Sequence, residues 1–182
     1  MRGLKYSVRR PDDTQLTAFN ADYYGRGQSE PVVLGQTGTY AVVVRENYGY
    51  RGEYRMRVTL VRGGIQMERE SNNSVGQVHV PVLTLEEGKQ KGRVHGYVGV
   101  ADGSGDYFGL GNLTVGTEIQ LGMIKPATSP LSWVMEVYRG DGTKVAEGEA
   151  GATPLVHVVA EGADGGYVAR VRAGANSGLL SQ

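Results

Sequence analysis

Apolar and polar side chains alternate with a period of two along several short stretches of this chain. The stretches are residues 40–44, 54–60, 77–83, 133–138 and 167–171. Such alternation is typical of half-buried β-strands, and no window shows sustained helical spacing. Glycine accounts for 29 of 182 residues, and turns such as residues 139–143 (RGDGT) offer the positive φ that tight hairpins need. The pattern predicts an all-β chain.

Two parts of the sequence resemble each other. Residues 8–17 align with residues 137–146, and residues 38–44 align with residues 165–171, at an offset of about 127 to 129 positions. A repeat of this length indicates a recurring structural unit. We therefore expect residues 1–62 to be the C-terminal half of one β-sandwich repeat, 63–75 a linker, and 76–182 a second copy.

The second copy is expected to lack its last strand, whose counterpart in the first copy is residues 53–60. Incomplete copies leave unpaired strand edges, and such edges are sites of pairing or aggregation. One hypothesis is therefore self-association through open edges, with one chain completing another by strand complementation.

The charges of the chain balance, with 19 Lys and Arg against 19 Asp and Glu. Without a net field we expect no nucleic-acid partner, and without an apolar run of about 20 residues we expect no membrane insertion. The absence of cysteine excludes disulfides and thiolate metal sites. The N-terminus has no signal-peptide run, so for a secreted protein we expect the signal outside this segment.

Four motifs connect the second copy to a known family. Residues 68–74 (ERESNNS) are similar to an opening Glu-x-Glu-Pro-Asn-Asn-Ser motif, with Ser71 in the proline position. Residues 105–108 (GDYF), 116–121 (GTEIQL) and 166–171 (GYVARV) are similar to later strand motifs of the same family. The chain thus resembles the bacterial pre-peptidase C-terminal domain family from Glu68 onward.

This resemblance implies a jelly-roll-like antiparallel β-sandwich without catalytic activity, carried by secreted or cell-surface bacterial proteins. In collagenase members it implies calcium binding and attachment to a fibrous substrate. We therefore expect an extracellular or cell-surface binding or spacer module, with calcium making the junction between repeats rigid. The alternatives are a targeting or adhesion module for polysaccharide or fibrous protein, and a self-assembling structural subunit.

Oxygen-bearing side chains gather in the two segments that supply calcium ligands in those relatives. Calcium takes six to eight oxygen ligands, and the candidates are Glu68, Glu70, Asn72, Asn73, Asp102 and Asp106. Asn73 replaces a common carboxylate, and the loop from Asp102 to Asp106 is one residue longer than in the family. The alternative interpretation is a solvated linker beside an ordinary turn, with Asp106 bonded to nearby amides.

Tyrosines are the second candidate group. There are 11 in the chain, and Tyr48, Tyr50 and Tyr54 lie within one turn region. Exposed tyrosines supply contact area for sugars or protein surfaces at low entropic cost. Alternatively, they cover the ends of the sandwich and bond to its backbone.

Catalytic patterns are missing from the sequence. The histidines at 79, 95 and 157 show no zinc-binding spacing, and no Gly-x-Ser-x-Gly motif occurs. We therefore expect a protein that is not an enzyme, with calcium as its candidate cofactor.

Overall fold

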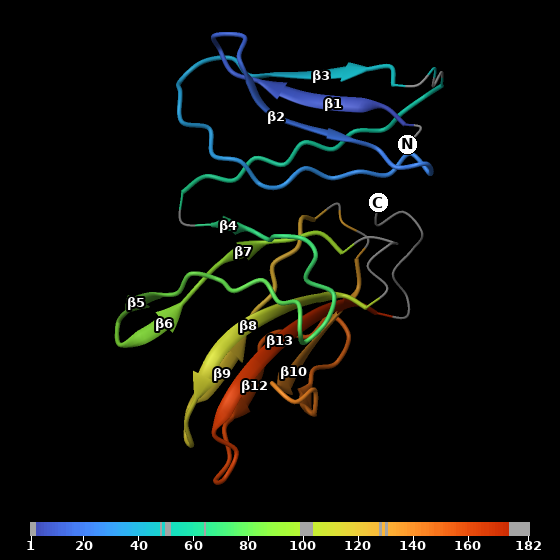
Figure 1. Ribbon diagram of the computed structural model, residues 1–182. Coiled ribbons are helices and arrows are strands. Elements are labelled where there is room, and N and C mark those ends of the chain that lie inside the picture. Colours follow the sequence, from blue (N-terminus) through green and yellow to red (C-terminus); the bar gives the residue numbers. More distant parts are fainter. Residues whose placement is uncertain are drawn as a thin grey trace. The chain divides into compact units, whose positions relative to one another are not determined.

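The strands that the alternation predicts dominate the structure. The computed structural model (Figure 1) describes residues 3–47, 49, 52–63, 65–98, 104–127, 129 and 131–174, and all the regular elements assigned within them are β-strands. The all-β prediction is confirmed. Among the described residues no helix is long and apolar enough to cross a bilayer. The chain divides into two compact units, Met1–Leu60 (unit 1) and Val61–Gln182 (unit 2).

Unit 1 contains a three-stranded antiparallel sheet in the order β2-β1-β3, drawn in blue to cyan in Figure 1. Its strands are β1 (Lys5–Arg9), β2 (Gln15–Asn20) and β3 (Ala41–Arg45). Tyr6 is buried on one face of this sheet, stacks on Phe19 at 4.9 Å and meets Tyr54 edge to face at 6.5 Å. Aromatic rings from β1, β2 and the segment after β3 therefore contact one another in unit 1.

Unit 2 is sandwich-like. Its main sheet has the order β11-β10-β13-β8, and a smaller sheet pairs β12 with β9. The buried side chains of Ile119, Val137, Val159 and Tyr167 form its core cluster, with residues of both sheets contributing. The strands are β8 (Asp106–Leu113), β9 (Glu118–Leu121), β10 (Trp133–Arg139), β11 (Lys144–Glu147), β12 (Leu155–Val158) and β13 (Gly165–Ala173).

Two small ribbons complete unit 2. β4 (Gln66–Met67) runs parallel to β7 (Val94–His95), and β5 (Thr84–Glu86) forms a hairpin with β6 (Lys89–Lys91). The two residues between β5 and β6 have φ values of 52° at Glu87 and 76° at Gly88. Positive φ at both central positions is what a two-residue hairpin turn requires.

The hairpin turns of the two sequence repeats have the same hydrogen bonds. The backbone N–H of Thr14 donates to Asp12 Oδ1 (3.0 Å), and that of Thr143 donates to Asp141 Oδ1 (2.8 Å). The hydrogen bonds from Thr14 and Thr143 lower the pKa values of Asp12 and Asp141. The two aligned segments therefore adopt one local structure.

Two strand predictions are wrong. Residues 54–60 and 77–83 contain no strand, although His79 forms an isolated parallel bridge with Phe108. The alternating apolar side chains of 54–60 remain exposed, from 46% at Met56 to 75% at Leu60. Alternation marks a segment that suits a sheet, but a strand also needs a neighbour with free backbone groups.

Candidate functional site

Glu68 is held immediately after β4. Its backbone N–H donates to the carbonyl of His95 (3.0 Å), which continues the parallel pairing of β4 with β7. Its carboxylate accepts a hydrogen bond from the Tyr97 backbone N–H at Oε1 (2.5 Å), and the residue is only 3% exposed. A Cβ at Gly96 would lie 2.5 Å from Glu68 Oε2, so glycine is the residue that leaves room for this carboxylate.

Asp106 enters the same region from the start of β8. It is 2% exposed, and the next residue, Tyr107, donates its backbone N–H to the carbonyl of Asn72 (2.7 Å). That bond attaches the segment after β4 to β8, although the two are more than 30 positions apart in the sequence. The opening motif and the Asp-Tyr-Phe motif therefore meet in space.

Three carboxylates come together at this point. Glu68, Glu70 and Asp106 each offer an oxygen, and these oxygens lie within 4.8 Å of one another. Two unit charges about 4 Å apart repel by roughly 4 kcal/mol in the environment of a protein surface. A divalent cation between the three carboxylates would convert this repulsion into attraction.

A buried amide supplies an independent indication of a ligand. Asn72 is 0% exposed, yet neither Oδ1 nor Nδ2 of its side chain makes a hydrogen bond within the described part of the chain. The buried Oδ1 of Asn73 likewise accepts no hydrogen bond within the described part of the chain. Leaving a buried polar group unsatisfied costs about 1–3 kcal/mol. Amide and carboxylate oxygens are the donors that calcium prefers, so these side chains fit a calcium ion.

His79 connects the segment of Glu68 and Glu70 to β8 by hydrogen bonds. Its Nδ1 accepts a hydrogen bond from the Arg69 backbone N–H (3.2 Å), and its own backbone N–H donates to the Tyr107 carbonyl (2.9 Å). Burial lowers the pKa of His79, and the charge of Arg69 lowers it further. The imidazole therefore holds the backbone at Arg69, between Glu68 and Glu70, next to the start of β8.

The structure brings together part of the predicted ligand set. Glu68, Glu70 and Asp106 form the cluster, and Asn72 and Asn73 lie on the same short segment with buried amide oxygens. Asp102 lies outside the described residues. The prediction overlooked Gly96, which leaves room for the Glu68 carboxylate, and Tyr97, whose backbone N–H donates to that carboxylate. No side-chain motif signals either one.

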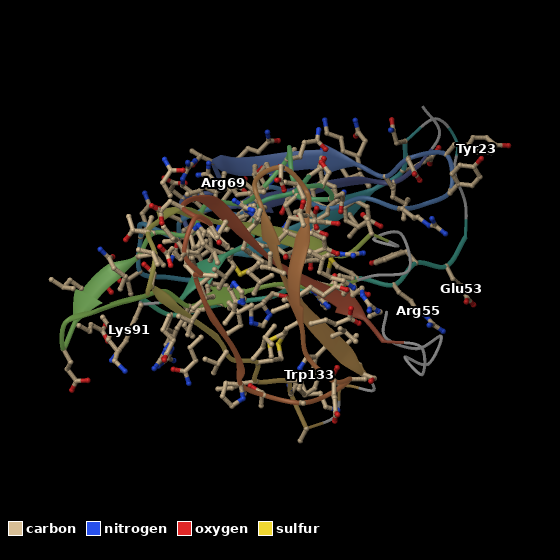
Figure 2. All side chains as sticks on the ribbon, turned by 90° about the horizontal axis from the view of Figure 1, so that it is seen from below. Tyr23, Glu53, Arg55, Arg69, Lys91 and Trp133 are labelled. Carbon is tan, nitrogen blue, oxygen red and sulfur yellow. The ribbon has the colours of Figure 1, made fainter. Side chains whose placement is uncertain are left out.

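The predicted tyrosine site is described only at Tyr54, since Tyr48 and Tyr50 lie outside the described residues. Tyr54 lines a hollow of about 240 Å³ in unit 1. The other lining residues are Leu4, Tyr6, Ala21, Tyr24, Gly25, Glu53 and Arg55. Figure 2 shows Glu53 and Arg55, together with Tyr23, at the end of unit 1 where β2 ends. This volume is below the roughly 300–1,000 Å³ of a small-molecule pocket, so it suits a single ring.

The fold and the site together define an all-β, sandwich-like chain with one acidic cluster among its described residues. Comparison of the chain with protein-family models, with curated proteins and with solved structures finds no match in any of the three.

Proposed function

We propose that this chain is a non-catalytic extracellular binding or spacer module whose second unit is stabilised by calcium. The observation that supports the proposal is the approach of Glu68, Glu70 and Asp106 to within 4.8 Å of one another. The buried amide of Asn72 adds a fourth oxygen donor on the same segment. The resemblance to the pre-peptidase C-terminal domain family, whose opening motif contains Glu68 and Glu70, supports the same conclusion.

Calcium would act by joining two distant segments of unit 2. Glu68 and Glu70 follow β4, whereas Asp106 starts β8, so one ion bound by all three closes a loop of more than 30 residues. A ligand that binds only the folded state stabilises it by about 2.7 kcal/mol at a hundredfold excess over the dissociation constant. The chain is then expected to be marginally stable in chelator and more stable in calcium.

Calorimetric titration of the full chain with calcium chloride tests this proposal, together with thermal unfolding in calcium and in EGTA. We expect binding heat and a higher melting temperature in calcium. Glu70→Gln and Asp106→Asn should each abolish most of the shift. Glu161→Gln, which alters an exposed acid in a distant turn, should leave it intact. The absence of both heat and thermal shift in the unaltered chain would refute the calcium site.

A second candidate function, attachment to a polysaccharide or fibrous protein, draws on the hollow beside Tyr54. Tyr24 and Tyr54 expose most of their rings there, and Glu53 and Arg55 add an acid and a base. Exposed tyrosines supply a large contact area at low entropic cost, which suits a surface that binds sugar rings or extended chains.

Retention of the chain on insoluble polymers such as chitin, cellulose and collagen tests this second candidate. The double variant Tyr24→Ala/Tyr54→Ala should lose retention without losing its fold. Leu85→Ala, which removes an exposed apolar side chain from β5, serves as the matched control. Equal retention of both variants and the unaltered chain would eliminate the hollow as a binding site.

A further inference from the structure

The sheet of unit 1 corresponds strand for strand to three strands of unit 2. The β1–β2 ladder shifts register between Val8 and Arg9, and the β10–β11 ladder shifts between Val137 and Tyr138, the aligned positions of the repeat. The agreement extends to the third strand in each sheet.

That third strand is β3 in unit 1 and β13 in unit 2. Val8 pairs with Val42 of β3, and Val137 pairs with Ala169 of β13, again at aligned positions. Gly38, three residues before β3, and Gly165, the first residue of β13, have φ values of 148° and 145°. The order β2-β1-β3 therefore has the same structure as the order β11-β10-β13.

Unit 2 continues its sheet where unit 1 ends. The far edge of β13 is paired with β8, for example Ala169 with Phe108. Among the described residues, β3 pairs only with β1, so its other edge is open. An edge with unpaired N–H and C=O groups is a template for another strand.

A second partner is missing from the loop between β2 and β3. In unit 2 the corresponding connection, between β11 and β13, contains Pro154 followed by β12, which pairs with β9. In unit 1 the sequence after Pro31 is likewise apolar (VVL), but it forms no strand. The side chains of Val32, Val33 and Leu34 are 39%, 86% and 42% exposed. The described residues of unit 1 thus contain a counterpart of β12 but no counterpart of β9.

One continuous segment supplies both strands in unit 2, since β8 and β9 are consecutive between Asp106 and Leu121. We propose that unit 1 is a docking site for an incoming segment of the β8–β9 type. Such a segment begins with an aromatic strand and continues through a Gly-Thr turn into an alternating Ile/Leu strand. Its first strand would pair with β3, and its second would cover the exposed Val32 and Leu34.

We assign the donor to a partner polypeptide whose β8–β9-type segment is not already paired. In this chain that segment is committed to β13 and β12, so donation by a second copy would require unit 2 to open. Addition of an extended strand to an open sheet edge is a common mode of peptide recognition, with main-chain hydrogen bonds giving affinity.

Successive residues of a β-strand direct their N–H groups to opposite edges, and this identifies which residue of β3 to alter. Gly166 of β13 and Gly174, the residue after this strand, bond to the β10 side. Ala169 is an odd number of positions away from both, so it directs its N–H toward β8. Its counterpart in unit 1 is Val42, whose N–H therefore faces the open edge. Proline is tolerated on an edge strand where the N–H faces solvent. Val42→Pro should thus preserve the β1–β3 ladder and remove one donor from the docking edge.

A synthetic peptide of residues 104–122, titrated into the full chain and followed by calorimetry, tests the proposal. We expect one peptide per chain, a negative heat-capacity change from apolar burial, and a rise in the melting temperature. Val42→Pro should weaken binding about tenfold, the effect of one lost backbone hydrogen bond. Val42→Thr, which keeps the N–H and a β-branched side chain, should bind like the unaltered chain.

Two results would overturn the assignment. Failure of the peptide to bind, or equal binding to the Val42→Pro variant with its fold intact by circular dichroism, would show that β3 is not the acceptor. Concentration-dependent dimers of the unaltered chain that exclude the peptide and are lost in Val42→Pro would identify a second copy as the occupant instead. The calcium titration is unaffected by either result, so this proposal and the calcium site stand or fall separately.

Discussion

Arg170 of β13 and Glu136 of β10 form a largely buried ion pair across the main sheet of unit 2, with Nη1 2.9 Å from Oε2. Glu136 is 2% exposed and also accepts hydrogen bonds from Arg172 Nε (3.0 Å) and the Tyr138 hydroxyl (3.0 Å). The Arg170 guanidinium lies over the Tyr107 ring at 5.2 Å. One carboxylate therefore organises cationic and aromatic side chains from several strands.

Glu136→Ala should lower the free energy of unfolding by about 3 kcal/mol, because removing one partner of a buried pair leaves the other charges uncompensated. Urea denaturation measures the change. Glu147→Ala, which removes a more exposed partner of Arg172, is the matched control and should lower it by no more than about 1 kcal/mol. Similar losses in the two variants would contradict a special role for Glu136.

Burial acts to raise the pKa of Glu136, but hydrogen bonds from Arg172 and Tyr138 and the charges of Arg170 and Arg172 outweigh it and lower the pKa below 4.5. The unfolded chain therefore takes up this proton first as the pH falls. The stability that ionised Glu136 gives to the folded chain is complete above about pH 4.5 and is lost as the pH falls through the lowered pKa. The Glu136→Ala variant should accordingly show a shallower decline in stability below pH 4.5.

Local features of the sequence predicted the strand over residues 133–138 and the turn that follows it at 139–143, because turn residues and alternation act over a few positions. They did not predict the environment of Glu136, since alternation assigns it to the solvent face of β10. Its burial arises from Arg170, which the register of β13 places opposite Glu136, and from Arg172, which lies diagonally from it, opposite Val134. The same limitation explains residues 54–60, where alternation indicates a strand but does not supply its neighbour.

Gly96→Ala should weaken calcium binding about tenfold or more. A Cβ at this position would lie 2.5 Å from Glu68 Oε2, so the carboxylate must move and loses its bond from the Tyr97 N–H. Overpacking of this kind also destabilises a fold by about 1–3 kcal/mol, so thermal unfolding in EGTA should be recorded beside the calcium titration. Gly76→Ala, where a Cβ meets nothing within 4 Å, is the control. Unchanged calcium affinity in Gly96→Ala would show that Glu68 is not a calcium ligand.

His79 should make the chain less stable as the pH falls through the range just below 6.5. Burial and the Arg69 charge lower its pKa in the folded chain, so the unfolded chain binds the proton first. The stability due to neutral His79 is thus full above about pH 6.5 and declines below it, toward the lowered pKa. In His79→Asn the amide oxygen can replace Nδ1 as acceptor for the Arg69 N–H, and the slope in this range should disappear. Urea denaturation at fixed calcium between pH 5 and 8 measures how the free energy of unfolding depends on pH. A slope that remains in His79→Asn would show that other groups cause the pH dependence.

The equivalence of the two hairpin turns predicts how each tolerates substitution. Asp13 has φ 65°, and Gly142, its counterpart in unit 2, has φ 88°. Gly142→Ala should lower the free energy of unfolding by about 1–2 kcal/mol, the cost of a left-handed backbone for a residue with a Cβ. Gly142→Asp should cost less, because a short polar side chain can bond locally in this conformation and aspartate already occupies the matching position in unit 1. Chemical denaturation of the two variants compares them directly, and equal losses would show that the turns differ in the conformations they accept.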